Sequence, residues 1–273
     1  MSETAHGYVM GHSDRERKRL ALQASILHPL TMDFFKRAGI GEGMHVLDVG
    51  CGVGDVSMIV AELVGPTGSV TGIDIDAEAV SVAREKASEK GHAHARFEES
   101  GIANFPAGIA YDAVVGRHIL IHLTDPVGAL KTAFSLLKPG GVAAFHEYDL
   151  VHYIPGYPTK PLNESISAFF SSFFGTMLAG DIALRLPGFF LQSGFVNPQS
   201  RAEALVDVAA GSKFHEWLAE TVRTILPKVQ MMGGPEPPVG DVETLAERLR
   251  EEAQRIGGSI VSPMMVGTFA KKP

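Results

Sequence analysis

Residues 44–54 read MHVLDVGCGVG, a short apolar run followed by three glycines at alternate positions. Such a run is typical of a buried strand, because aliphatic and β-branched residues pack well in a sheet. Glycines directly after a strand let the backbone approach a ligand that a Cβ would block. Apolar residues at helical spacing follow, and the unpaired N–H groups at the start of a helix suit a negative ligand group. The stretch therefore predicts a strand, a ligand-binding turn and a helix.

Two carboxylates near this turn restrict the ligand. Asp74 ends the next predicted strand, where a carboxylate can bind both ribose hydroxyls of a nucleoside. Asp48 lies two residues before Gly50, where it would repel a pyrophosphate but could bind the ammonium of a sulfonium amino acid. Asp55 stands where the dinucleotide fingerprint requires its last glycine. These residues favour S-adenosylmethionine over NAD.

Strand and helix patterns alternate up to residue 150 and change beyond it. This alternation predicts an α/β fold with a Rossmann-like sheet of seven mostly parallel strands and helices on both faces. We also expect an N-terminal helical lid and inserted cap helices. The expected divisions are 1–40 for the lid, 41–150 for the cofactor-binding core, 151–181 for a cap insertion, 182–206 for a core helix and strand, 207–258 for a second helical cap insertion and 259–273 for a closing strand. Within these divisions, residues 138–141 are expected to form a turn and residues 260–270 the closing strand.

Four motifs resemble class I S-adenosylmethionine-dependent methyltransferases, in particular the small-molecule branch that includes the ubiquinone and menaquinone enzymes. The motifs are residues 46–54, 72–76, 111–115 and 136–141. The resemblance implies that S-adenosylmethionine is the cofactor and that a methyl group is transferred to oxygen, nitrogen or carbon of a small acceptor.

The same resemblance assigns the cofactor contacts by position. It places the methionine end of the cofactor against Asp48, Gly50, Gly52 and Arg117. The ribose would contact Asp74, and the adenine would contact Ile75, Gly101 and Ile102. Tyr8 and Gln23 would close over the cofactor as lid residues. Gly101 stands where the family often has an aspartate, so the backbone near Gly101 and Ile102 would replace that contact. Arg117 could instead be a packing or surface residue.

Candidates for acting on the acceptor follow the fourth and fifth predicted strands, where open α/β sheets bind ligands. His118 is the first candidate for a general base, with His122 and Glu147 beside it, because these groups can accept a proton near neutral pH when suitably placed. Each histidine could instead be a helix-packing or hydrogen-bonding residue, and Glu147 could either orient a substrate or cap a loop. An aromatic segment could roof an apolar pocket or serve core packing or a dimer face: Tyr153, Tyr157, Phe169, Phe170, Phe173 and Phe174.

The composition argues against several classes of binding partner. Of the 273 residues, 45% are hydrophobic and the formal net charge is −7, which argues against nucleic acid or an anionic membrane as the main partner. The single cysteine, Cys51, allows no internal disulfide, and we find no signal peptide or membrane span in the sequence. A cytoplasmic enzyme without a metal site is expected, and a homodimer is compatible with the sequence.

Three other functions compete with methyl transfer. The chain could use bound S-adenosylmethionine to promote a cyclisation or rearrangement, it could be an NAD-dependent dehydrogenase, or it could be a non-catalytic partner of another methyltransferase. The presence of both the glycine turn and Asp74 argues against a degenerate site.

Overall fold

The computed structural model describes residues 14–106, 108, 110–177, 180–231 and 238–273, and these contain one main sheet of seven strands. The strands are β1 (His45–Val49), β2 (Ser69–Asp74), β3 (Ala95–Glu99), β4 (Tyr111–Arg117), β5 (Leu137–Asp149), β6 (Gln199–Glu203) and β9 (Met264–Lys271). Their order is β3-β2-β1-β4-β5-β9-β6. The first five pair in parallel, whereas β9 is antiparallel to both β5 and β6. The predicted Rossmann-like, mostly parallel sheet is confirmed.

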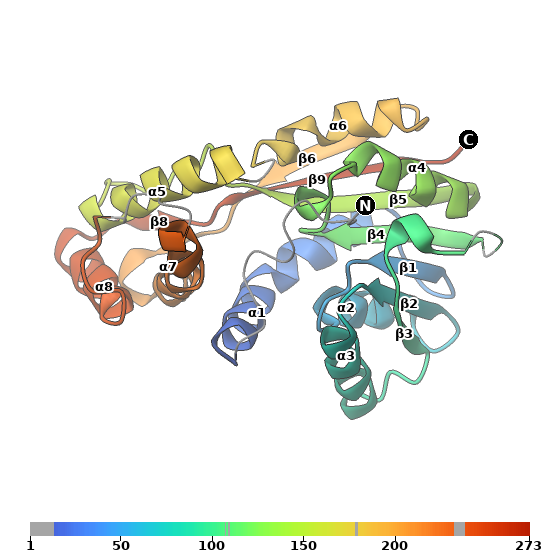
Figure 1. The fold of residues 1–273 in the computed structure, drawn as a ribbon, viewed down its shortest axis with the longest axis horizontal. Helices are drawn as coiled ribbons and strands as arrows, with labels where there is room; N and C mark the ends of the chain where they lie inside the picture. Colours follow the sequence, from blue (N-terminus) through green and yellow to red (C-terminus); the bar gives the residue numbers. More distant parts are fainter. Residues whose placement is uncertain (1–13, 107, 109, 178–179, 232–237) are drawn as a thin grey trace.

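Helices cover both faces of this sheet (Figure 1). α1 (Asp14–Arg37), α2 (Asp55–Val64) and α3 (Ala77–Glu89) lie on one face, and α4 (Pro126–Leu136) and α6 (Ile182–Gln192) lie on the other. The central strands are apolar on both sides because helices bury both faces, as a parallel sheet requires. The parallel strands all end at one edge of the sheet, where open α/β sheets bind ligands.

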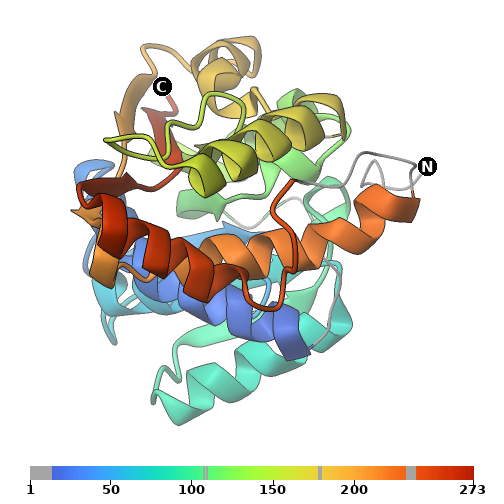
Figure 2. The same cartoon turned by 90° about the vertical axis from the view of Figure 1, so that its left-hand side faces the viewer.

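A second group of elements lies beyond the edge at which β4 and β5 end (Figures 1 and 2). It contains α5 (Pro161–Met177), α7 (Phe214–Met231), α8 (Leu245–Ile256) and a two-stranded sheet of β7 (Val206–Val208) and β8 (Ser259–Val261). We call this group the cap. Its helix α7 contacts α5 and α8 and also packs against α1, so the N-terminal helix and the cap meet.

Two elements expected from the sequence differ from those in the structure. The stretch 260–270 is not a single strand, because β8 pairs with β7 in the cap and β9 begins only after Pro263, which has no N–H to donate to a ladder. The turn expected at 138–141 lies inside β5 as a bulge. Leu137 pairs with Tyr111 and Val142 pairs with Ala113, so the four residues between Leu137 and Val142 oppose only Asp112.

The helices of the described residues include none that is long and apolar enough to cross a membrane.

Candidate active site

The glycine turn between β1 and α2 forms a cradle that is open at one residue. Gly50, Gly52 and Gly54 have φ angles of 67°, 51° and 84°, in the left-handed region that strains other residues. A Cβ at Gly50 would lie 2.4 Å from Cδ1 of Ile119, and one at Gly54 would lie 3.0 Å from Cβ of Ala83. At Gly52, no atom of the described chain lies within 4 Å of that position apart from Gly52 itself and its two chain neighbours. A ligand can therefore approach the backbone at Gly52.

Asp48 is buried beneath this cradle with one oxygen satisfied. Ser57 Oγ donates to Oδ2 at 2.6 Å, whereas Oδ1 has no hydrogen-bond partner among the described residues. Burial raises the pKa of the Asp48 carboxyl to about 7, against the opposing effect of the Ser57 hydrogen bond. A cationic group next to Oδ1 would stabilise the carboxylate, so Asp48 fits the ammonium of S-adenosylmethionine.

Asp74 connects the turn to the end of β2. Gly52 N donates to its Oδ2 at 2.8 Å, and Asp76 N donates to its Oδ1 at 3.0 Å. Burial raises the pKa of the Asp74 carboxyl, although these two N–H groups favour its charged form. Each oxygen keeps a further lone pair for a ribose hydroxyl. Ile75 follows with half of its surface exposed, which offers an apolar plane beside that carboxylate.

Gly101 and Ile102 lie after the end of β3, next to the end of β2. Ser100 N donates to the carbonyl of Asp74 at 2.9 Å, which holds the two strand ends together. The Ile102 side chain is buried in the core at the start of a 3-10 turn, η1 (Ile102–Asn104). Only backbone groups of these residues are thus available to an adenine ring.

Arg117 ends β4 on the same face as α1. Its Nη1 donates to Thr31 Oγ1 at 2.9 Å. Burial lowers the pKa of the Arg117 guanidinium, while Asp55 and Asp48 oppose that shift. A partly enclosed guanidinium that donates to a hydroxyl rather than to a carboxylate suits a ligand carboxylate.

Gln23 of α1 joins three parts of the molecule. Its Oε1 accepts a hydrogen bond from Arg19 Nη1 at 2.8 Å and another from Trp217 Nε1 at 3.2 Å, and its Nε2 lies 3.3 Å from Nδ1 of His118. This buried amide therefore links the N-terminal helix, the cap and the end of β4. Tyr8, the other lid residue expected from the sequence, lies outside the described residues.

His118 follows β4 directly and has a positive φ of 56°. Its ring stacks on Tyr148, with centroids 4.2 Å apart, and its Nε2 lies 3.3 Å from Sδ of Met265. Burial lowers the pKa of His118 well below its usual value of 6.5, and the nearby Arg117 adds to this effect. The imidazole is therefore neutral at physiological pH.

Glu147 caps the 3-10 turn η2 (Leu120–His122), which follows His118. Its Oε1 accepts hydrogen bonds from the N–H groups of Ile119 at 3.0 Å and Leu120 at 2.9 Å, and Oε2 has no partner within the described part of the chain. Burial raises the pKa of Glu147 to about 8, and it lowers the pKa of His122 to about 4. His118 and His122 thus lie in one loop after β4, and Glu147 of β5 contacts that loop through its carboxyl group.

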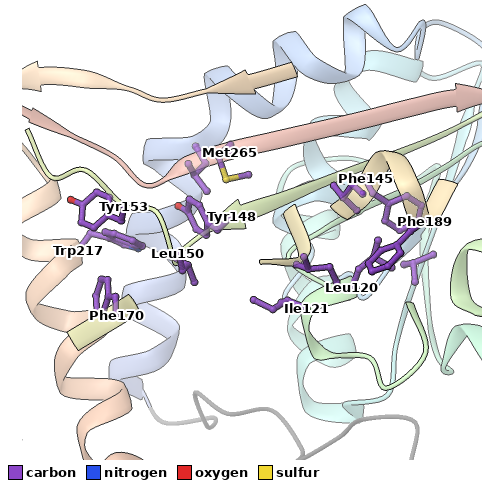
Figure 3. Close-up of a cluster of buried hydrophobic side chains, with 14 of the residues drawn as sticks. Leu120, Ile121, Phe145, Tyr148, Leu150, Tyr153, Phe170, Phe189, Trp217 and Met265 are labelled. Atoms are coloured by element: carbon purple, nitrogen blue, oxygen red, sulfur yellow. The ribbon is translucent and has the colours of Figure 1, made fainter. Parts of the chain in front are cut away.

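An aromatic cluster adjoins this loop at the base of the cap (Figure 3). Its members are Tyr148, Tyr153, Phe170 and Trp217, and the apolar side chains of Leu150 and Met265 lie beside them. Tyr157 was expected in such a cluster, but its side chain is 81% exposed, since residues 155–157 run along β8 at the surface. The expected Phe169, Phe170 and Phe173 are buried, and the Phe174 side chain is not among those described.

Sequence reasoning missed Arg19, Trp217 and Met265. Trp217 is the only tryptophan of the chain, which could have drawn attention to it, but no pattern connects residue 217 with residue 23. Within the described residues, no group of three or more His, Cys, Asp or Glu side chains could hold a metal ion.

The sheet order, the open glycine cradle and the two carboxyl groups at Asp48 and Asp74 define a class I S-adenosylmethionine-binding enzyme. A family described as a methyltransferase domain matches residues 40–179. A demethylmenaquinone methyltransferase from Anoxybacillus flavithermus is 30% identical over 207 residues, which cover 70% of this chain and 85% of the relative. A ubiquinone biosynthesis O-methyltransferase from Sodalis glossinidius is 38% identical over 124 residues, 44% of this chain and 47% of the relative.

The protein belongs to this methyltransferase family and is an S-adenosylmethionine-dependent methyltransferase. Among solved structures, the [4+2]-cyclase SpnF has the same fold, with a TM-score of 0.53 and 20% identity over 90% of this chain and 81% of that one. At that identity the similarity to the cyclase concerns the fold alone.

Proposed function

We propose that the protein methylates a small apolar or aromatic metabolite, bound between the ends of β4 and β5 and the cap. The observation that carries this proposal is the aromatic cluster of Tyr148, Tyr153, Phe170 and Trp217 beside the loop of His118. Rings of this kind bury flat apolar ligands well. Two relatives are named for demethylmenaquinone and for ubiquinone biosynthesis, and both names denote quinones. An aromatic acceptor of quinone or quinol type is therefore our first choice.

In this proposal, the bound S-adenosylmethionine supplies a methyl group already activated by its sulfonium. The residues beneath and around the cradle hold its methionine end, with Asp48 on the ammonium, Arg117 on the carboxylate, and Gly50 and Gly52 allowing close approach. Asp74 binds the ribose hydroxyls. Adenine packs on the exposed side chain of Ile75 and reaches the backbone of Gly101 and Ile102.

His118 is the residue that we propose to act on the acceptor, because it follows β4 directly and stacks on Tyr148 in the aromatic cluster. Glu147 supports that position by holding the start of η2. His122, at the end of η2, serves the same loop. The protein's main contribution is orientation, which accounts for most of the rate of a transfer whose donor is already activated.

A small acceptor also agrees with the net charge of −7, which does not favour a polyanion such as RNA. With a single cysteine and no internal disulfide to form, the chain suits a reducing compartment, and we propose that it works in the cytoplasm.

Two measurements test this function. Calorimetric titration should show binding of S-adenosylmethionine and none of NADH. Mass spectrometry of reactions with reduced naphthoquinones and substituted phenols should then show a product heavier by one methyl group, together with S-adenosylhomocysteine. A rearranged but unmethylated product with intact cofactor would instead support the cyclisation alternative, and tight NADH binding would support a dehydrogenase.

A further inference from the structure

We infer that His118 meets the acceptor as a neutral hydrogen-bond donor through Nε2–H, and that Gln23 is the positioning residue that fixes this tautomer. The inference deepens the proposed function and rests on it for the identity of the acceptor. The tautomer itself follows from contacts within the chain.

The orientation of the Gln23 amide is set by its partners. The guanidinium of Arg19 and the indole N–H of Trp217 can only donate hydrogen bonds, and both point at the same atom of Gln23, at 2.8 and 3.2 Å. That atom must be the carbonyl oxygen. If the amide were turned over, its NH2 group would face two donors, one of them charged, in a buried site where an unsatisfied polar group costs about 1–3 kcal/mol. The NH2 group of Gln23 therefore faces His118.

The Gln23 amide then decides where the proton of His118 sits. The NH2 group of Gln23 lies 3.3 Å from Nδ1 of His118 and can only donate, so Nδ1 must present its lone pair. The ring proton is thus on Nε2. Protonation of both nitrogens would place one N–H against another. Among the described residues, the titratable groups that act most strongly on the ring come from α1, β4, β5 and η2, and these include no carboxylate that would favour an imidazolium: Arg19, Arg117, His122, His146 and Tyr148.

The Nε2–H group points toward a weak partner. It lies 3.3 Å from the thioether sulfur of Met265, which accepts hydrogen bonds poorly and whose unbranched side chain can move aside. Stacking on Tyr148 holds the ring plane in place. Tyr148, Met265 and Trp217 lie together at the base of the cap (Figure 3). His118 therefore offers a donor, with no free lone pair, to whatever binds there.

A donor selects a different acceptor from the one a general base would select. An N–H group stabilises an oxygen that is already negative, so it suits an acidic phenol, enol or hydroxyquinone that loses its proton to solvent before transfer. The acceptor oxygen then forms a bond to the methyl carbon, and the electron pair of the breaking carbon–sulfur bond stays on sulfur. The protein receives no proton in this step. This assignment replaces the base role for which the sequence makes His118 the first candidate.

The tautomer can be measured directly by 15N NMR of the full chain labelled at histidine, with S-adenosylhomocysteine present. The His118 signals, identified by their loss in His118→Gln, should show a protonated Nε2 and an unprotonated Nδ1. In Gln23→Glu, a carboxylate replaces the amide and can only accept, so the proton should move to Nδ1. Ser25→Ala changes an exposed side chain on the same helix and should leave the wild-type pattern unchanged. A wild-type proton on Nδ1, or no change in Gln23→Glu, would overturn the inference.

A second comparison tests the donor role in catalysis. His118→Gln keeps an N–H near the Nε2 position without a titratable base, whereas His118→Leu removes the donor; both impose a similar strain at this positive φ. With 2-hydroxy-1,4-naphthoquinone, an acceptor that is ionised at neutral pH, kcat should fall about 100-fold in His118→Leu and by no more than about 10-fold in His118→Gln. Equal losses in both variants would contradict the donor role. If the wild type methylates no acceptor, the proposed function fails, while the NMR tautomer still decides the positioning role of Gln23.

Discussion

Two buried carboxyl groups in this site each have an oxygen atom without a hydrogen-bond partner in the part of the chain that the structure describes. Asp48 and Glu147 are both fully buried, and within the described residues each has one carboxyl oxygen that accepts no hydrogen bond. Burying a charge without compensation is costly, so such groups either take up a proton or meet a ligand of opposite charge. The position of Asp48 beneath the glycine cradle fits the second case, and that of Glu147 in a backbone cap fits the first.

Replacing Asp48 by Asn should weaken cofactor binding without harming the fold. The amide oxygen can still accept the hydrogen bond from Ser57, but it offers no charge to an ammonium, and a charge-assisted hydrogen bond contributes about 1.5–3 kcal/mol. We expect the Kd for S-adenosylmethionine to rise by about 10- to 100-fold at pH 7.5, measured by calorimetry. The melting temperature of the unliganded protein should be unchanged or higher. An unchanged Kd would show that Asp48 does not contact the ammonium.

Gly52→Ala should separate the cost of strain from the cost of blocking the cradle. The residue has a positive φ and open space around a new Cβ, and Gly91, just after α3, has the same two properties outside the cradle. Both substitutions should lower the free energy of unfolding by about 1 kcal/mol. Only Gly52→Ala should reduce the affinity for S-adenosylmethionine, by at least about 10-fold by calorimetry. Similar affinities in the two variants would argue that no ligand approaches Gly52.

At the scale of elements, adjacent residues of β5 contact different parts of the molecule. Side chains alternate between the faces of a strand, so Tyr148 points toward α1 and the cap while Glu147 points toward η2. The loop that carries His118 is thereby held from the neighbouring strand. Its geometry depends on the carboxyl group of Glu147, whose pKa lies near 8.

The stability of this element should depend on pH. The usual pKa of a Glu carboxyl is 4.5 and burial raises that of Glu147 to about 8, so between these values the folded state keeps a proton that the unfolded chain has lost. Raising the pH from 5 to 8 should therefore reduce the contribution of Glu147 to the free energy of unfolding of the unliganded protein, whereas the buried histidines, whose pKa values are lowered, act in the opposite direction below about pH 6.5. Glu147→Gln keeps an acceptor for the N–H groups of Ile119 and Leu120 and should remove this contribution, so the wild type should lose more stability than the variant between pH 5 and pH 8. Urea unfolding at several pH values measures it.

Two controls accompany that experiment. Glu164→Gln, at an exposed position of α5, should leave the pH slope as in the wild type. Glu147→Ala removes the backbone cap altogether and should be about 1–3 kcal/mol less stable than Glu147→Gln at every pH, because neither variant titrates at this position. A slope that is the same in Glu147→Gln and in the wild type would mean that Glu147 is ionised in the folded protein.

At the scale of the whole molecule, three parts that are far apart in sequence meet at one buried amide. Gln23 belongs to the N-terminal helix, Trp217 to the cap and His118 to the end of β4. At the surface, Arg15 of α1 also forms an ion pair with Glu243 at 2.9 Å, just before α8. The helix and the cap thus close the same end of the sheet (Figure 2).

Hydrogen exchange should reveal how far this arrangement responds to ligands. S-adenosylhomocysteine should slow exchange in the turn between β1 and α2, in the loop after β4 and in α1, because a bound ligand stabilises the segments that contact it. The outer helix α8 should respond little until an acceptor is added as well. Protection confined to the glycine turn would show that α1 does not close over the cofactor.

The sequence by itself was enough to predict the sheet, the glycine turn and the cofactor. These depend on local patterns: a buried strand, glycines at fixed spacing and Asp74 at the next strand end all lie within about 30 residues. It also placed His118, His122 and Glu147 near one another, because parallel strands end at a common edge.

Only the tertiary structure decided how the acceptor side is built. Gln23 and Trp217 are 194 residues apart, and no periodicity or motif links them; they meet because α7 packs on α1. The tautomer of His118 follows from that meeting, as do the partners of Glu147 and the split of 260–270 into β8 and β9. Hydrogen bonds between side chains that are distant in sequence depend on packing in three dimensions. The glycine turn and its cofactor could therefore be predicted from the sequence, whereas the hydrogen bonds around His118 and Glu147 could not.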